Sequence, residues 1–160
     1  MTTLMLRRTV PVVFSCAVAI GMTTAPNAGA ASATAVDVTK QACYETDGYP
    51  PDGGRSTGED PVRYKWDNTP YIGARYSSCG RVARIYYGGY TTNTTHYNVR
   101  WAPPGGSWRQ TELGPGARQV WTISAAWGDY NFMVQACNRG GIFQQSRCTN
   151  WSPQLYLNTR

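Results

Sequence analysis

Residues that could do acid–base or nucleophilic chemistry are few in this chain. His96 is the only histidine, and no Gly-x-Ser-x-Gly or comparable nucleophile motif accompanies it. It begins a predicted strand with its side chain on the outer face, which favours a solvated imidazole over a general base. Glu59 and Asp60 are the one adjacent acidic pair, in a loop rich in proline and glycine. We therefore expect no catalytic residues, no enzymatic activity and no cofactor.

Residues 1–30 have the pattern of an export signal. Arg7 and Arg8 form a basic start, an uncharged apolar run from 10 to 22 follows, and Ala28-Gly29-Ala30 supplies small residues for cleavage. The run is short for a membrane span. Three alternatives stay open: cleavage a few residues later, an uncleaved anchor, or lipidation at Cys16. We expect a secreted, extracellular protein with no stable membrane insertion after cleavage.

Cleavage would remove Cys16 and leave four cysteines, an even number that predicts two disulfides in an exported chain. Three pairings are possible among Cys43, Cys79, Cys137 and Cys148. No Cys-x2-Cys pair exists, and with one histidine the chain lacks the ligand pattern of a zinc site. We expect no metal.

The charge of the mature chain argues against a nucleic-acid partner. Without Arg7 and Arg8, 13 basic side chains face 9 acidic ones, a net charge of +4. The arginines are scattered singly, whereas nucleic-acid binders usually concentrate basic residues in one patch.

Alternating apolar and polar residues predict seven short strands between turn-forming segments. They cover residues 71–76, 81–87, 96–101, 108–113, 119–123, 130–136 and 155–157. No window outside the signal has a helical apolar period. Residues 31–69 are rich in turn formers, and only 62–66 alternates like a strand. The pattern predicts an all-β, two-sheet antiparallel sandwich with an irregular N-terminal extension.

Three segments within residues 70–160 have a specific pattern: Tyr130-x-Phe132-x-Val134-x-Ala136, residues 152–159, and Tyr97-x-Val99-x-Trp101 followed by Pro-Pro-Gly-Gly. Together they resemble a fibronectin type III domain, which implies a sandwich of the immunoglobulin-like type. The alternation Tyr130-x-Phe132-x-Val134-x-Ala136 resembles that family's sixth strand, with Tyr130 in the position of its corner tyrosine. Residues 152–159 are similar to its closing strand, and Tyr97-x-Val99-x-Trp101 followed by Pro-Pro-Gly-Gly is similar to its third strand and turn. The resemblance implies adhesion, spacing or ligand binding.

The sandwich implied by this resemblance also orders the cysteines. Cys137 and Cys148 would lie at one end and Cys79 at the other, too far for a bond. The implied pairs are Cys137–Cys148 and Cys43–Cys79, the second tethering the extension. The expected organisation is a signal peptide at 1–30, a disulfide-tethered extension at 31–69 and the sandwich at 70–160.

Three surfaces are candidates for ligand binding. Trp108 and Trp127 lie in or beside turns, where aromatic rings can stack on sugars or anchor a protein. The outer face of the third and sixth strands carries Arg100 and Met133. The disulfide-clamped loop 138–147 exposes Arg139 and Phe143, and loops on rigid sandwiches often carry recognition. Alternatively, the aromatic rings pack the extension onto the sandwich, and the polar face is merely solvated.

The best-supported expectation is a secreted, non-catalytic binding module for a protein or a cell-surface polysaccharide. A carbohydrate-binding module that uses exposed tryptophan and tyrosine is the second hypothesis. A small secreted enzyme or enzyme inhibitor is the third.

Overall fold

The computed structural model describes residues 42–90 and 92–160. The predicted export signal, its alternative cleavage sites and Cys16 lie outside these residues. No helix that could span a membrane occurs within the described ranges.

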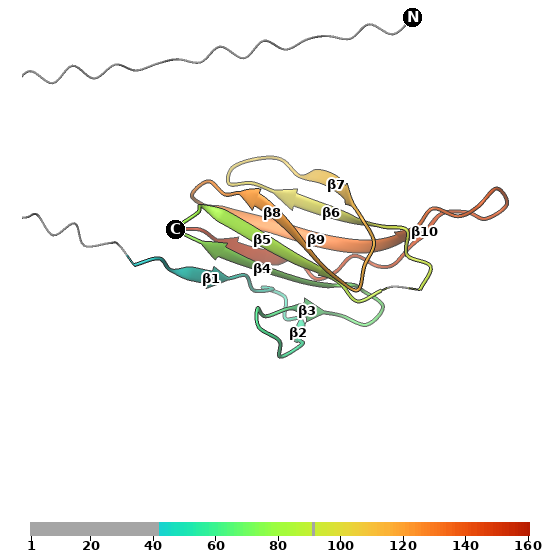
Figure 1. Ribbon diagram of the computed structural model, residues 1–160, viewed down its shortest axis with the longest axis horizontal. Coiled ribbons are helices and arrows are strands. Elements are labelled where there is room, and N and C mark those ends of the chain that lie inside the picture. The colour runs from blue at the N-terminus through green and yellow to red at the C-terminus, as the bar shows by residue number, and fades with distance from the viewer. Residues whose placement is uncertain (1–41, 91) are drawn as a thin grey trace, which may run out of the picture. The chain divides into compact units, whose positions relative to one another are not determined.

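Strands account for all regular structure in these two ranges (Figure 1). Their bounds are β1 Glu45–Asp47, β2 Arg55–Ser56, β3 Tyr64–Lys65, β4 Tyr71–Ser77, β5 Val82–Gly88, β6 His96–Ala102, β7 Arg109–Leu113, β8 Arg118–Ser124, β9 Asp129–Asn138, β10 Arg147–Cys148 and β11 Leu155–Asn158. All seven strands predicted from alternation are confirmed, as β4 to β9 and β11.

The strands form two antiparallel sheets that pack face to face (Figure 1). The first sheet has the order β2-β3-β4-β5-β8, with β1 also paired to β4. The second has the order β10-β9-β6-β7, with β11 also paired to β9. The predicted all-β sandwich is therefore confirmed.

Alternate residues of the long strands build the core between the sheets. Ile72 and Ile85 from the first sheet and Val99 and Phe132 from the second are fully buried, as period-two alternation requires. Trp101 packs against this core and meets Trp121 edge to face, with ring centroids 5.7 Å apart. Full burial of an aliphatic or phenylalanine side chain, as at these four positions between the sheets, contributes about 1.5–3 kcal/mol to stability.

The described part of the extension, 42–69, joins the first sheet. Strand β1 pairs with β4, with Glu45 opposite Ser77, and β3 pairs with β4 through Tyr64 and Ile72. The sequence predicted only the strand at 62–66; β1 and β2 are too short to show alternation. The described residues, 42–90 and 92–160, belong to one compact unit.

The two disulfides lie at opposite ends of the sandwich. Cys137–Cys148 lies at the end that we call the hairpin end, where the β5–β6 loop and the β9–β10 hairpin meet. Cys43–Cys79 lies at the end that we call the aromatic end, beside the β4–β5 turn and the β8–β9 turn. Both implied pairings are confirmed.

Candidate functional site

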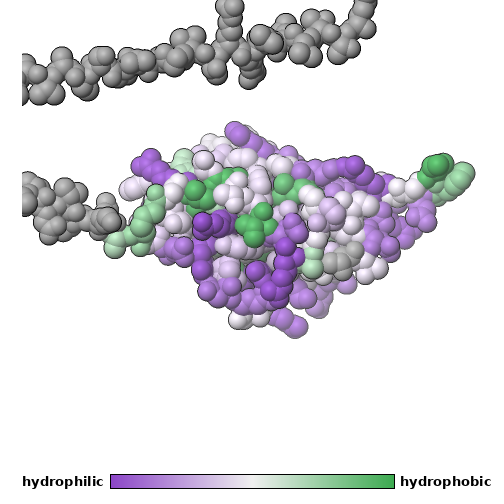
Figure 2. All heavy atoms as spheres, viewed as in Figure 1, coloured by the Kyte–Doolittle hydropathy of each residue, from purple (hydrophilic) through white to green (hydrophobic). Residues whose placement is uncertain are grey.

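The β9–β10 hairpin is the most protruding part of the described chain (Figure 1). Cys137 and Cys148 are directly paired across its two strands, with Cα atoms 4.1 Å apart, so the disulfide clamps the base of the loop. At the tip, Ile142 and Phe143 are 96% and 98% exposed. Figure 2 shows this apolar tip in green beyond a largely polar body. The sequence-based prediction of an exposed Phe143 is confirmed.

Local hydrogen bonds shape the loop that presents this tip. Asn138 Oδ1 accepts a hydrogen bond from the Gly140 amide at 3.0 Å, and Ser146 Oγ donates one to the Arg139 carbonyl at 3.0 Å. Gly140 has a φ of 61°, and a Cβ there would collide with the Gln144 carbonyl. Glycine is the residue that adopts this conformation without steric cost.

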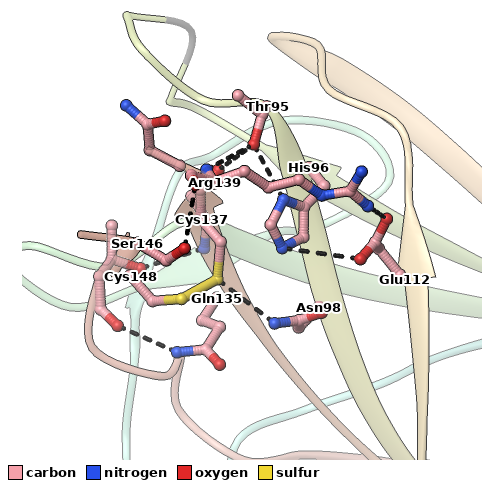
Figure 3. Close-up of a disulfide and its surroundings, with 12 residues drawn as sticks. Thr95, His96, Asn98, Glu112, Gln135, Cys137, Arg139, Ser146 and Cys148 are labelled. Atoms are coloured by element: carbon pink, nitrogen blue, oxygen red, sulfur yellow. Dashed lines mark hydrogen bonds and ion pairs between the residues drawn. A yellow bond between two sulfur atoms is a disulfide. The ribbon is translucent and has the colours of Figure 1, made fainter. Parts of the chain in front are cut away.

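Thr95 joins the base of the hairpin to the start of β6 (Figure 3). Its amide donates to the Cys137 carbonyl at 2.8 Å, and its hydroxyl oxygen accepts from the Arg139 amide at 3.0 Å. The Asn98 side-chain amide, through Nδ2, also donates to Cys137 Sγ at 3.3 Å. These bonds fix the orientation of the hairpin relative to the second sheet. The tip therefore extends from a base that is held by hydrogen bonds, which we call the braced base.

His96 lies in an arrangement of the described residues that resembles a catalytic set. Its Nδ1 is 2.9 Å from the Thr95 hydroxyl, and its Nε2 is 3.8 Å from Glu112 (Figure 3). The Glu112 carboxylate also accepts a hydrogen bond from Arg139, and the Thr95 hydroxyl donates to the Cys137 carbonyl at 3.2 Å. The hydroxyl and the carboxylate are thus engaged in bonds that hold the hairpin.

The expectation of a solvated His96 is wrong in one respect. The side chain lies on the outer face, as alternation required, but it is only 12% exposed. Arg139 and Glu112 extend beside the ring (Figure 3). Sequence alternation assigns a face, but it does not show that long side chains from neighbouring elements will cover it.

An open groove of about 790 Å³ lies beside the hairpin. One wall is Tyr90 with 92–94 from the β5–β6 loop, and the other is formed by residues 143–145 and Arg147. The floor is the Cys137–Cys148 disulfide and Thr149. Most of the lining is amide and hydroxyl side chains, with an aromatic ring on each wall.

Tyr97 holds the Tyr90 wall in place. Its hydroxyl accepts a hydrogen bond from the Tyr90 amide at 3.2 Å and donates to the carbonyls of Tyr90 and Gly116. The side chain is fully buried, and burial raises the pKa of its phenol above the ordinary value. A phenol is already protonated at neutral pH and can donate, and the raised pKa extends the protonated range of this hydroxyl to more alkaline pH.

A second hollow, of about 290 Å³, lies at the aromatic end. Its lining includes Tyr44, Tyr76, Arg81 and Trp127, beside Cys79. Trp127 is 64% exposed. Trp108 is also exposed but does not line this hollow. The two tryptophans chosen from the sequence are thus not brought together in one pocket.

The third candidate surface is the outer face of the second sheet. Arg100 is directly opposite Met133 across β6 and β9, so these two predicted residues share the face, and Asn98 is opposite Gln135. The Arg100 guanidinium lies over the Trp151 ring, 5.4 Å from its centroid. This cation–π contact already engages Arg100, and Trp151, from the segment before β11, was not among the predicted residues.

Five of the six predicted binding residues therefore divide among three places. Phe143 and Arg139 belong to the hairpin end, Arg100 and Met133 to the outer face, and Trp127 to the aromatic end. Trp108 lies in the connection between β6 and β7, outside both hollows. No described group of three or more His, Cys, Asp or Glu side chains is placed to hold a metal. Comparisons with protein families, with curated proteins and with solved structures find no match.

Proposed function

We propose that this chain is a secreted, non-catalytic binding module that contacts its ligand with the hairpin end. The observation that carries the proposal is the almost complete exposure of Ile142 and Phe143 at the tip of a disulfide-clamped hairpin. Two large apolar side chains held in water favour a bound state that buries them. Each contributes about 1.5–3 kcal/mol when fully buried.

The arrangement of strands supports a fibronectin type III-like module. Strands β4, β5 and β8 form one layer, and β11, β9, β6 and β7 form the other. The Tyr130 hydroxyl accepts a hydrogen bond from the Ala126 amide at 2.7 Å, four residues upstream. Such a bond is the tyrosine corner found in immunoglobulin-like sandwiches.

The disulfides support export. Both pairs lie in a domain that reducing conditions would weaken, and such bonds persist mainly outside the cytosol. The export signal expected at residues 1–30 is consistent with that compartment.

The favoured ligand is a protein on or near the cell surface. A protruding apolar pair fits a pocket on a folded partner, where central, fully desolvated anchors carry most of the binding energy. The braced base lowers the ordering cost of association.

The test is capture from cell-surface extract by the oxidised protein, followed by titration of the purified partner. Replacing Ile142 and Phe143 with Ser should weaken that defined interaction at least tenfold. The matched control is Trp127→Ser, which removes an exposed aromatic ring at the opposite end. A partner retained equally by the hairpin variant would contradict the proposal.

Carbohydrate binding at the aromatic end is the second candidate. Trp127 and Tyr44 line one hollow, and aromatic rings can pack on sugar faces. A glycan array and an insoluble-polysaccharide pulldown would test it with Trp127→Ala, and with Trp108→Ala as the comparison outside the hollow. Absence of glycan retention by the wild-type protein would exclude it.

A further inference from the structure

Strand β8 is an edge strand whose backbone is open on one side. It is the last strand of the first sheet and pairs only with β5 among the described strands. The Ala125 amide bonds to the carbonyl of Arg81 directly opposite, and the Gly89 amide bonds in the same way to Ala117. Odd-numbered residues of this segment therefore direct their backbone groups toward β5.

The even-numbered residues must then direct their N–H and C=O groups away from β5. These residues are Arg118, Val120, Thr122 and Ser124, and all four are exposed. Among these four, Val120 is a large apolar side chain that is 53% exposed. An exposed row of unpaired backbone groups is a template for pairing with another strand.

The opposite sheet has an edge of different character. Strand β7 carries Arg109 and Glu112 within five residues, and charges on an edge strand discourage pairing. Strand β8 has seven residues, no proline and a single charge, Arg118. Glu59 accepts a hydrogen bond from that arginine at 3.0 Å, so the charge is neutralised within the chain.

We propose that two copies of this chain associate through β8 in antiparallel pairing about a two-fold axis at Trp121. This register places Val120 opposite Thr122 and Arg118 opposite Ser124, so that each arginine faces a neutral residue. All four outward-directed residues then lie in hydrogen-bonded pairs, with about eight backbone hydrogen bonds, because each such pair exchanges two. If the two-fold axis lay at Val120 or at Thr122 instead, the outward-directed residues would form only three hydrogen-bonded pairs instead of four.

The side chains agree with this register. In the first sheet, Tyr86 is opposite Val120 and Arg84 is opposite Thr122. Joining two copies would extend the same outer face across the axis, with β-branched Val120 and Thr122 side by side. Such cross-strand pairs each contribute about 0.2–1 kcal/mol. The hairpin end is not part of this surface, so the inference is independent of the proposed function.

The first test is sedimentation equilibrium of the exported, oxidised protein over a wide concentration range. The apparent mass should rise from one copy toward two. Val120→Lys and Thr122→Pro should each keep the protein monomeric, because lysine and proline on an edge oppose strand addition. Gln110→Lys, which adds the same charge on exposed β7, should dimerise as the wild type does.

Amide hydrogen exchange of the wild-type protein provides a test that needs no variant. The amides of Val120, Thr122 and Ser124 should become protected as the concentration rises, and the exposed β7 edge should not. A protein that is monomeric at every concentration overturns the proposal. So does a dimer unaffected by Val120→Lys, or protection of these amides that is independent of concentration, which would mean that the chain covers its own edge.

Discussion

The two ends of the sandwich each carry a disulfide, a hollow and a tyrosine hydroxyl that bonds to backbone, yet they are built differently. At the hairpin end, Cys137–Cys148 closes a short hairpin whose apolar tip extends into solvent. At the aromatic end, Cys43–Cys79 joins the extension to a turn of the sandwich. One disulfide shapes a surface, and the other connects distant parts of the chain. Stability and ligand binding should therefore respond differently to the same kind of change at the two ends.

Removal of the disulfides should have the largest effect on stability. The sequence separation is 36 for Cys43–Cys79 and 11 for Cys137–Cys148. Loop-closure entropy then predicts losses of about 4 and about 3 kcal/mol respectively when each pair is replaced with alanine. Denaturant unfolding would measure both.

Binding should show the opposite order. The Cys137/Cys148 variant should lose affinity for the partner, because the hairpin is no longer held at its base. The Cys43/Cys79 variant should retain affinity under conditions where it is folded. Equal loss of binding in the two folded variants would remove the functional distinction between the ends.

Hydroxyl removal gives a matched, smaller comparison. Tyr97→Phe leaves the Tyr90 amide and two carbonyls without their partner and should cost about 2 kcal/mol. Tyr130→Phe leaves one amide, that of Ala126, and should cost about 1 kcal/mol. Thermal unfolding of both variants would measure the order. Costs in the reverse order would show that the Tyr97 bonds do not hold the groove wall.

The contrast between the ends also shows what the sequence could predict. Alternation located the seven longer strands because each turns one face toward the core; that face is buried in β4, β5, β6, β9 and β11 and only partly buried in β7 and β8. The resemblance supplied the order that paired the cysteines correctly. Strands β1, β2 and β10 have only two or three residues, so no period is visible in them. Their positions follow from pairing with β4, β3 and β9.

Individual site residues were predictable only where local sequence decides exposure. Phe143 follows Gly140-Gly141-Ile142 in a clamped loop, so its exposure could be predicted. The contacts of Arg139 with Glu112 and of Arg100 with Trp151 join residues far apart in sequence, and no local pattern indicates them. The adjacency of Tyr44 and Trp127 likewise depends on where the extension folds back.

Alkaline pH should lower the free energy of unfolding through three buried tyrosines. Burial is the main cause that raises the pKa of Tyr71, Tyr87 and Tyr97. In the unfolded chain these phenols titrate at about pH 10. Above that pH the folded state retains protons that the unfolded state loses, so stability falls by about 1.4 kcal/mol per pH unit for each such group. The contribution is fully present below about pH 10 and is lost as pH rises through the folded pKa.

The measurement is the free energy of unfolding from pH 8 to pH 11, in wild type and in Tyr97→Phe. The variant should show a shallower decline, because one of the three titrating groups is gone. An unchanged slope would mean that this phenol does not ionise on unfolding in that range.

The smallest effects on stability should come from the exposed rings. At these positions we expect the two ends to differ in ligand binding and not in stability. Phe143→Ser and Trp127→Ser each remove a side chain that is mostly in water. Both should change the free energy of unfolding by less than about 0.5 kcal/mol. If the hairpin end binds the partner, Phe143→Ser should weaken binding with no loss of stability, while Trp127→Ser leaves it unchanged. If Trp127→Ser weakened binding instead, the binding site would have to be assigned to the aromatic end, because neither substitution acts through the fold.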